Sequence, residues 1–438
     1  MANRIITALD IGSTKVSTVI SSLEEGQPPS VIGVASYPSQ GLKKGVVVNI
    51  DDAINSIAAS LEAAERMAGL TVSSVYISIN GKHITSTNNK GVVAVAQDEI
   101  IADDVFRAIE SARTVSIPPS REILHVIPRE FIVDAQGGIK DPIGMSGTRL
   151  EVDAHIISAT SSALHNLVKV VQQLGLRVDD IVFTGWSASN AVLTATEKEL
   201  GVMQLDIGGG TSSITTFVED AITYSGSLPF GGANVTSDLA IGLRVSLEDA
   251  ERIKLNAEEL IKNTKEEAVS AATEKREKVL GRAKSKAKAA KKKTKDVIDI
   301  TKLEINGVNT ISKKLFEEII EARLSEIFDL LIKQVDDAGH ETRLPAGIVL
   351  TGGSALLPGV TTIAKRVFGV PARIGYPKGL EGLVDEISSP AYSVVQGLTL
   401  YGSMDEGYSG PRKQAAAASG GGEGIGSRIG SFIKNLLP

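Results

Sequence analysis

One short motif occurs twice in this chain, and the repetition limits the folds that the chain can adopt. ALDIGSTKV at 8–16 and QLDIGGGTS at 204–212 each end an apolar strand in an aspartate, turn on glycine and continue with Ser or Thr. Glycine lets backbone N–H groups approach a phosphate closely, and the hydroxyls add donors. The repeat predicts two facing hairpins that clamp one polyphosphate. Two ordinary hairpin turns, with aspartate as a turn residue, are the alternative.

Charged side chains accompany both turns. Lys15 would bring a point charge to the phosphates, and Asp10 and Asp206 stand where the two strands end, facing one pocket. Aspartates in such a place can hold Mg²⁺ through water.

A third glycine turn, TGGS at 351–354, follows another apolar strand. Its backbone could pass close to a flat purine and its ribose, although such turns are also common without a ligand. Glu251 and Lys254 lie three residues apart in EDAERIK, on one helix face. They could hold the ribose hydroxyls or form a solvent-exposed ion pair.

Composition excludes several classes of function. The chain has 438 residues, enough for about three domains of ~150 residues each. Its 46 basic and 52 acidic residues give a net charge of −6, and aromatic residues are few, so no nucleic-acid partner is expected. The chain has no cysteine and no histidines three or four residues apart, which argues against thiolate and histidine metal sites. With no secretory signal and no run of ~18 apolar residues, the protein is expected in the cytoplasm.

Periodicity predicts strands and helices along most of the chain. A β-hairpin is expected over 4–20, and apolar spacing predicts a helix over 51–68, capped by Asp51 or Asp52. The further expected strands are 75–79, 91–95, 125–133, 149–157 and 181–184, and the further helices are 102–115, 163–174 and 187–196. Residues 246–336 are rich in helix, 348–359 form a strand, a glycine turn and a helix start, and 403–424 form a low-complexity linker.

Two segments carry a distinctive charge pattern. The stretch 262–302 has eight Lys or Arg and no acidic residue between Arg282 and Lys295. It is either a solvated segment without a binding role or a segment that attracts an acidic partner or anionic lipid. In the tail 425–438, six apolar side chains fall within an arc of about 140° of a helix: Ile425, Ile429, Phe432, Ile433, Leu436 and Leu437. Arg428 and Lys434 lie opposite, so the tail is predicted to lie on an anionic membrane, with docking on the protein's own core as the alternative.

The order of these motifs resembles the superfamily of actin, Hsp70 and the sugar kinases. Four further segments resemble the FtsA family of bacterial cell-division proteins: LHVIPREF at 124–131, GIKDPIGMSGTRLE at 138–151, NVTSDLA at 234–240 and SPAYSVVQGLTLYG at 389–402. The resemblance runs from about residue 4 to 402 and resumes in the C-terminal tail.

The resemblance implies an actin-like, two-lobed α/β ATPase fold with an inserted small α+β subdomain, called 1C, and a C-terminal amphipathic helix. The expected division is 1–83, 162–198 and 376–402 for subdomain 1A, 84–161 for 1C, 199–229 and 337–375 for 2A, 230–336 for 2B, 403–424 for a flexible linker and 425–438 for the membrane-targeting helix.

The resemblance also implies a binding site for ATP and Mg²⁺. The residues expected at the phosphates are Gly12, Ser13, Thr14, Lys15, Gly208, Gly209, Gly210 and Thr211. Asp10 and Asp206 belong to the Mg²⁺ shell, Glu251 and Lys254 lie beside the ribose, and Gly352, Gly353 and Ser354 lie beside the adenine. The segment TGWSASN at 184–190 lacks the Gln or Glu that orients water in efficient ATPases of the superfamily, so at most slow hydrolysis is expected.

The function that the resemblance implies is to self-associate into filaments on the inner face of the cell membrane and to recruit FtsZ filaments to the septal ring at the division site. The FtsZ C-terminal peptide would bind subdomain 2B, with Lys313, Lys314 and Arg323 as candidate contacts, although Arg323 could instead pair within the helix bundle. A pilus-assembly protein of the actin-like group and a soluble sugar or small-molecule kinase are the alternatives.

Overall fold

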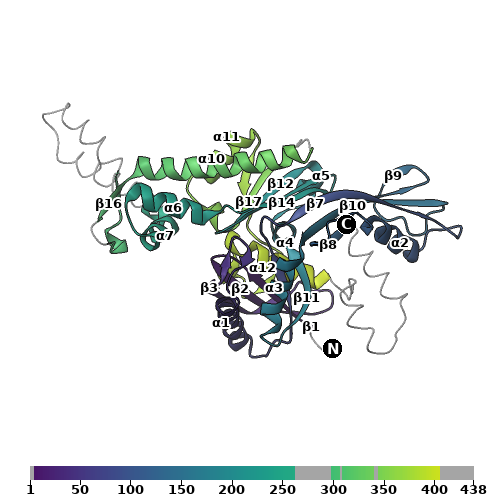
Figure 1. Ribbon diagram of the computed structural model, residues 1–438, viewed down its shortest axis with the longest axis horizontal. Helices are drawn as coiled ribbons and strands as arrows, with labels where there is room; N and C mark the ends of the chain where they lie inside the picture. The colour runs from purple at the N-terminus through teal and green to yellow at the C-terminus, as the bar shows by residue number, and fades with distance from the viewer. Residues whose placement is uncertain (1–3, 262–296, 306–307, 340–343, 405–438) are drawn as a thin grey trace.

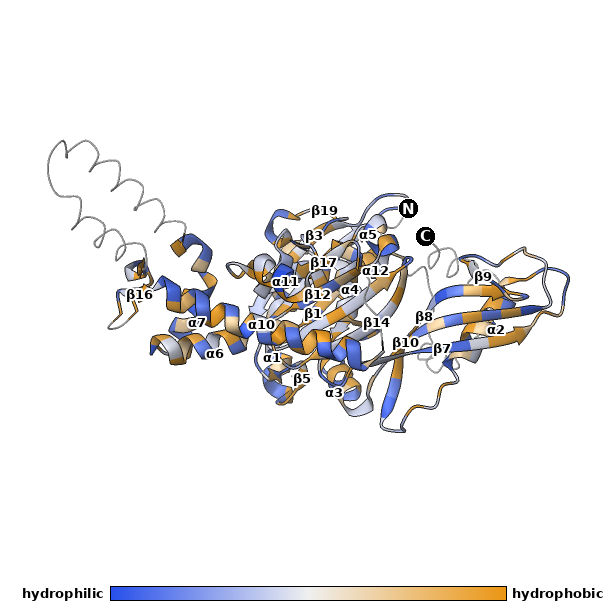
Figure 2. Ribbon diagram, turned by 90° about the horizontal axis from the view of Figure 1, so that it is seen from above, coloured by the Kyte–Doolittle hydropathy of each residue, from blue (hydrophilic) through white to orange (hydrophobic). Residues whose placement is uncertain are grey.

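The computed structural model describes residues 4–261, 297–305, 308–339 and 344–404. Figure 1 shows an elongated molecule with a helical unit around α6 and α7 at one end and a small sheet, β7 to β10, at the other. Two larger sheets lie between these ends, one below the other in that view. In Figure 2 the hydrophobic residues gather on the strands of the central sheets, as expected for strands covered by helices.

The first sheet contains the first hairpin and has the order β11-β6-β1-β2-β3-β19. Its strands are β1 (Arg4–Ile11), β2 (Lys15–Leu23), β3 (Ser30–Pro38), β6 (Ser74–Ile79), β11 (Arg177–Phe183) and β19 (Glu381–Gly382). β1 pairs antiparallel with β2 and parallel with β6, so β1 and β6 end at the same edge of the sheet. That shared edge carries the first glycine turn.

Helices cover both faces of this sheet because side chains alternate along its central strand. In β1, Leu9 belongs to the core beneath α1 (Ile50–Ala68) and α3 (Ser161–Gln172). Ile6 and Ala8 belong to the core beneath α4 (Thr184–Val192) and α12 (Ser393–Met404). All three side chains are fully or almost fully buried, so the sheet is a rigid base for the turn at its edge.

The second sheet repeats this arrangement around the second hairpin, in the order β14-β13-β12-β17-β18. Its strands are β12 (Val202–Ile207), β13 (Ser212–Val218), β14 (Ala221–Leu228), β17 (Gly347–Thr351) and β18 (Ala372–Ile374). As in the first sheet, the hairpin strand β12 pairs antiparallel with β13 and parallel with the next strand, β17. The accompanying helices are α5 (Ala195–Leu200), α6 (Gly232–Leu243), α7 (Leu247–Leu255), α10 (Lys313–Asp337) and α11 (Val360–Phe368).

The third sheet forms a unit with its own core. It has the order β7-β10-β8-β9, with the strands β7 (Thr85–Ala94), β8 (Arg121–Val133), β9 (Gln136–Ile139) and β10 (Arg149–Thr160). Helix α2 (Ala102–Arg113) packs on it through Val105 and Ile109, which are buried against Phe131 and Leu150. Two minor hairpins, β4 (Leu42–Lys43) with β5 (Val46–Val47) and β15 (Val297–Asp299) with β16 (Thr310–Ser312), complete the strands of the described ranges.

The elements follow the predicted pattern, with local corrections. The helix predicted over 51–68 is α1, but its N-cap is Asn49, whose side-chain oxygen accepts hydrogen bonds from the backbone N–H groups of Asp51 and Asp52. The single helix predicted over 187–196 is two helices, α4 and α5, because Thr194 caps a new helix start with its hydroxyl. Asparagine and threonine both satisfy the free N–H groups of a first turn.

Several predictions lie outside the described residues. These are most of the basic stretch 262–302, most of the linker 403–424, and the whole tail 425–438 with its candidate membrane residues Ile425, Arg428, Ile429, Phe432, Ile433, Lys434, Leu436 and Leu437. The limits proposed for the subdomains also stay predictions. Among the helices that the structure describes, none is long and apolar enough to cross a membrane.

Candidate functional site

The two glycine hairpins have the same local geometry. The aspartate of each motif pairs across its hairpin with a serine, Asp10 with Ser17 and Asp206 with Ser213. Two residues later, the glycine N–H donates to a backbone carbonyl three residues on, from Gly12 to Lys15 at 3.1 Å and from Gly208 to Thr211 at 2.9 Å. The repetition seen in the sequence is therefore a repetition of structure.

The two turns meet each other directly. A Cβ built on Gly209 would lie 2.2 Å from Thr14 Cγ2, and one built on Gly210 would lie 2.8 Å from the Cβ of Ser13. Real Cβ atoms do not approach so closely, so these positions accept only glycine as the structure stands. The sheets thus bring together the turns of two motifs that lie 196 positions apart in the chain.

Two carboxylates and one ammonium group lie at this meeting point. Ser78 Oγ donates to Asp10 Oδ1 at 2.6 Å, yet burial raises the pKa of Asp10 above its usual value. Burial, and then the charge of Asp10, raise the pKa of Asp206 to about 7, while Lys15 acts in the opposite direction. Burial lowers the pKa of Lys15 to about 8, against the attraction of both carboxylates. Two acids that share a site with one cation lack positive charge, and such a site suits a divalent cation.

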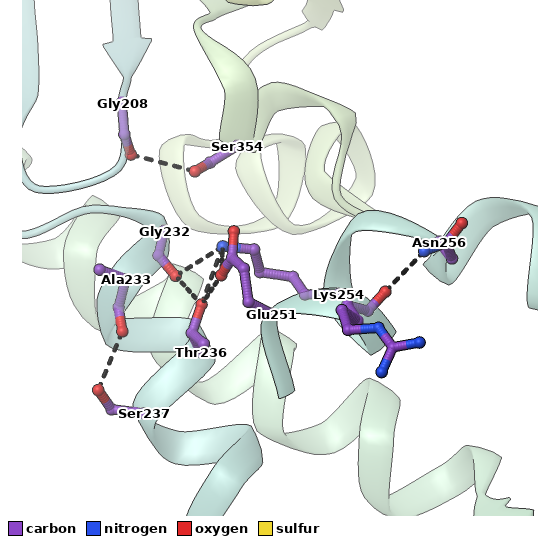
Figure 3. A network of polar contacts seen from close by, with 10 residues as sticks. Gly208, Gly232, Ala233, Thr236, Ser237, Glu251, Lys254, Asn256 and Ser354 are labelled. Atoms are coloured by element: carbon purple, nitrogen blue, oxygen red, sulfur yellow. Dashed lines mark hydrogen bonds and ion pairs between the residues drawn. The ribbon is translucent and has the colours of Figure 1, made fainter. Parts of the chain in front are cut away.

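The third glycine turn closes on the second. Gly352 has a φ of +82°, and a Cβ there would lie 2.5 Å from Asp206 Oδ1 and 2.6 Å from the carbonyl oxygen of Ile207. Ser354 Oγ donates to the carbonyl of Gly208 at 3.2 Å, as Figure 3 shows. Gly353 is open, since its nearest neighbour would be the Cβ of Ala391 at 3.8 Å. The backbone of this turn therefore lies against the second hairpin, with room beside Gly353.

Glu251 and Lys254 form a network of polar contacts with the start of α6, rather than an ion pair exposed to solvent (Figure 3). Lys254 Nζ lies 2.7 Å from Glu251 Oε2 and donates to Thr236 Oγ1 at 2.9 Å and to the carbonyl of Gly232 at 3.2 Å. Only 10% of the Lys254 side chain is exposed, against 40% of Glu251. The carboxylate is thus the accessible end of the pair.

The network is continuous with the second glycine turn. The backbone N–H of Gly232 donates to the carbonyl of Gly208 at 2.9 Å, and that of Ala233 donates to Gly209 at 2.8 Å. The first turn of α6 is therefore fixed to the second hairpin. This places Glu251 and Lys254 next to the second glycine turn, and their role beside a ribose stays a prediction.

Several residues at the site were missed by the sequence analysis. Asn80, directly after β6, donates through Nδ2 to Thr211 Oγ1 at 3.0 Å and to Ser213 Oγ at 2.7 Å, so it links the two hairpins. Ser78, in the same strand, holds Asp10. The available signal was a polar end to the strand 74–79, but only the parallel pairing of β1 and β6 brings it to the first turn.

Two contacts between a lysine and an aromatic ring lie beside the turns. Lys15 Nζ lies 3.3 Å from the centroid of the Tyr392 ring. Lys44 Nζ lies 5.5 Å from the ring centroid of Phe230, which precedes the start of α6. Neither ring carries a sequence signal, because each comes from a segment distant in the chain from the cation that it contacts.

The candidate partner residues lie on α10, away from the glycine turns. Arg323 forms a two-point ion pair with Asp238 of α6, at 2.5 and 2.9 Å, and a further pair with Glu326. Lys313 lies 3.7 Å from Glu317, whereas Lys314, 3.6 Å from Glu318, is 73% exposed. Of the three, Arg323 serves to join α6 to α10, which was the alternative considered from the sequence.

Among the described residues, Asp10 and Asp206 have no third acidic or histidine side chain beside them that could complete a metal site. Within the part of the chain that the structure describes, no three His, Asp or Glu side chains converge to hold a metal ion. A cation at this place would therefore need water or phosphate oxygens to complete its shell.

Comparison with known proteins identifies the family. A family model described as cell division protein FtsA matches residues 203–397, and one described as the SHS2 domain inserted in FtsA matches 81–158. Proteins named cell division protein FtsA are 35% identical over 401 residues in Pseudomonas aeruginosa, covering 92% of this chain and 90% of the relative, and 31% identical over 442 residues in Escherichia coli K12, covering 99% and 96%. The chain belongs to the FtsA family of cell-division proteins.

A solved structure shares the fold. The chain matches a structure described as a PilM–PilN type IV pilus biogenesis complex with a TM-score of 0.58 and 16% identity, over 91% of this chain and 98% of that chain. The predicted actin-like α/β fold with an inserted small α+β unit is therefore confirmed. The C-terminal helix lies outside the described residues and stays a prediction.

Proposed function

We propose that this chain binds ATP with Mg²⁺, polymerises on the inner face of the cytoplasmic membrane and tethers FtsZ filaments to it at the division site. The nucleotide part of the proposal is carried by one observation. Two hairpin turns of the same geometry meet over Asp10, Asp206 and Lys15, with a third glycine turn beside them.

The chain's own residues fit a magnesium–nucleotide complex. The backbone N–H groups of the two turns, the hydroxyls of Ser13, Thr14 and Thr211 and the ammonium of Lys15 would hold the phosphates. Asp10 and Asp206 would hold Mg²⁺ through water, and the ion would supply the positive charge that this pair of acids lacks.

The other predicted residues would hold the nucleoside. The accessible carboxylate of Glu251, kept in place by Lys254, would accept hydrogen bonds from the ribose hydroxyls. The backbone of Gly352, Gly353 and Ser354 would lie along the adenine, since Gly353 has open space beside it.

The site favours nucleotide binding over rapid hydrolysis. Residues 184–190 form the start of α4, where the sequence TGWSASN has neither Gln nor Glu to orient an attacking water. The bound nucleotide would then act as a conformational element that links the two sheets. We expect ATPase activity to be slow or absent.

The membrane part of the proposal rests on the sequence of the tail 425–438. Burial of six apolar side chains is worth roughly 10 kcal/mol at most, and ordering the helix offsets much of it. Two cations facing anionic lipid add about 1 kcal/mol each. One copy would therefore bind marginally, whereas a filament with many copies would bind firmly.

The contact with FtsZ is proposed for the surface of α10. Lys314 is the exposed cation of the three candidates, with Lys313 beside it on the first turn of the helix. Arg323 is already paired with Asp238, so we expect it to hold α10 in place rather than to bind the peptide itself.

Titration calorimetry with ATP, with and without Mg²⁺, tests the nucleotide site. Lys15→Ala should abolish ATP binding with the fold intact, because it removes the ammonium beside both turns. Lys365→Ala, which removes an exposed lysine of α11, is the matched control and should bind ATP as the wild type does. Unchanged affinity in Lys15→Ala would remove Lys15 from the phosphate site.

Co-sedimentation with anionic liposomes and Mg-ATP tests the membrane site. The full chain should pellet with the liposomes and form filaments on them in electron micrographs, while a chain truncated at Gly424 should stay in the supernatant. If both stay in the supernatant, the tail does not bind lipid, and a phosphorylation assay over a sugar panel becomes the next experiment.

Fluorescence anisotropy with a labelled FtsZ C-terminal peptide tests the partner site. Lys314→Ala should weaken binding, because it removes the exposed cation of the α10 surface. Equal affinity of Lys314→Ala and the wild type would exclude this lysine from the contact.

A further inference from the structure

The Lys15 ammonium lies against the ring of Tyr392. Lys15 begins β2, directly after the first glycine turn, and its Nζ lies 3.3 Å from the centre of the Tyr392 ring. At that distance the ammonium sits on the face of the ring, where the ring quadrupole attracts a cation.

The Tyr392 ring lies closer to the Lys15 ammonium group than any carboxylate of the described residues does. Asp10 and Asp206 attract Lys15 over a longer distance. In the described ranges, no carboxylate oxygen lies within 4.0 Å of Lys15 Nζ, the limit for an ion pair. An aromatic ring has no net charge, so it can hold the ammonium group in place without competing with an anionic ligand for it, as a carboxylate would. The N–H groups of Lys15 that point away from the ring stay available for an anion.

The segment that carries Tyr392 is held from several sides. The carbonyl of Pro390 accepts hydrogen bonds from the N–H of Gly352 at 3.1 Å and from Thr351 Oγ1 at 3.2 Å. Ser36 Oγ, on β3, donates to the Tyr392 hydroxyl at 3.4 Å. The ring is therefore placed between the first sheet and the third glycine turn.

We propose that Tyr392 is a positioning residue for the nucleotide: its ring holds the Lys15 ammonium beside the two phosphate turns before ATP arrives. The inference rests on the proposed function, because it assigns Lys15 to the phosphates. The ring orders a flexible side chain in advance, so less conformational entropy is lost when the phosphates bind.

The first test measures whether the ring holds the lysine when no nucleotide is present. Thermal unfolding of Lys15→Met, Tyr392→Leu and the double variant forms a double-mutant cycle. The shifts in melting temperature should fall short of additivity by about 1–2 °C. Tyr392→Phe, which keeps the ring face, should show the wild-type coupling. Additive shifts would overturn the contact, and this result does not depend on ATP.

The second test measures the role in binding. Tyr392→Leu should weaken ATP affinity about fivefold to tenfold, as expected for a cation–π contact worth about 1–1.4 kcal/mol. Tyr392→Phe should bind ATP within about twofold of the wild type. Tyr376→Leu makes the same change at an exposed tyrosine and should leave the affinity unchanged.

The outcomes separate the inference from the function on which it rests. Wild-type binding of ATP with equal weakening in Tyr392→Leu and Tyr392→Phe, or with no weakening in either, would overturn the positioning role and leave the proposed function standing. Absence of ATP binding in the wild type would overturn the proposed function itself.

Discussion

Replacing Asp206 by asparagine should stabilise the nucleotide-free protein at neutral pH. The Asp206 side chain is buried, and its pKa rises from 3.8 to about 7 because burial and the nearby Asp10 disfavour the charged form. A shift of roughly three pKa units corresponds to about 4 kcal/mol at ~1.4 kcal/mol per unit. Asparagine has nearly the same shape and no charge. Asp206→Asn should therefore remove up to about 4 kcal/mol of destabilisation above pH 7.

The sign of the effect follows from the proton balance. Between pH 3.8 and 7 the unfolded chain has lost the Asp206 proton, while the folded chain still holds it. Stability due to this group therefore falls as pH rises through that window. Burial lowers the pKa of His125 to about 3 and that of His83 to about 4, which makes stability rise with pH over part of the same range. The histidines are present in both proteins, so their contributions cancel in the difference between variant and wild type.

Chemical denaturation at several pH values between 4 and 7.5, without nucleotide or divalent cation, checks this prediction. The difference in unfolding free energy between Asp206→Asn and the wild type should be small near pH 4 and grow to several kcal/mol by pH 7.5. Asp98→Asn, at an exposed carboxylate, is the control and should give a flat difference. A flat difference for Asp206→Asn as well would refute the reasoning.

The same variant connects stability with function. The wild type should gain stability when Mg-ATP is added, because a divalent cation compensates the buried charges. Asp206→Asn should gain much less, since it lacks one of the two acids beside the turns. An equal gain in both proteins would mean that Asp206 is not part of the cation site.

Two further predictions concern packing. Gly209→Ala should destabilise the protein by about 1–3 kcal/mol, because its Cβ would lie 2.2 Å from Thr14 Cγ2. Gly208→Ala, with its nearest contact at 3.3 Å, should cost less in the same denaturation assay, and equal losses would contradict the contact between the turns. Arg323→Ala should cost about 1–2 kcal/mol of unfolding free energy, because Asp238 loses its two-point partner. An unchanged unfolding midpoint would show that this pair does not hold α6 to α10.

Local signals in the sequence were sufficient for the hairpins and for most helices. Each glycine hairpin has its strand, turn and return strand within one short stretch of the chain, 4–23 and 202–218, so hydrophobic pattern and turn chemistry suffice to predict it. The residues at which helices begin and end were harder to predict from the sequence. Thr194 divides one predicted helix into α4 and α5, and Asn49 rather than an aspartate caps α1, because capping depends on side-chain geometry.

Contacts between residues far apart in the chain could not be predicted from local sequence signals. Asn80 reaches Thr211 across 131 positions, and Ser78 reaches Asp10 across 68. Arg323 has several acidic residues near it in the sequence, yet its two-point partner, Asp238, is 85 positions away. Such pairs arise from the order of strands in a sheet and from helix packing, and neither leaves a mark in the local pattern.

The sequence by itself determined the chemistry that this protein can offer: glycine turns for phosphates, two aspartates and one lysine for charge, and an amphipathic tail. These are properties of single residues and short spacings, so they do not depend on how the chain folds. Only the tertiary structure decided that the two turns touch, that Asp206 is buried close to the charge of Asp10, and that Tyr392 covers Lys15. The physical reason is that distance and burial, which set pKa values and contact energies, are created when the sheets come together.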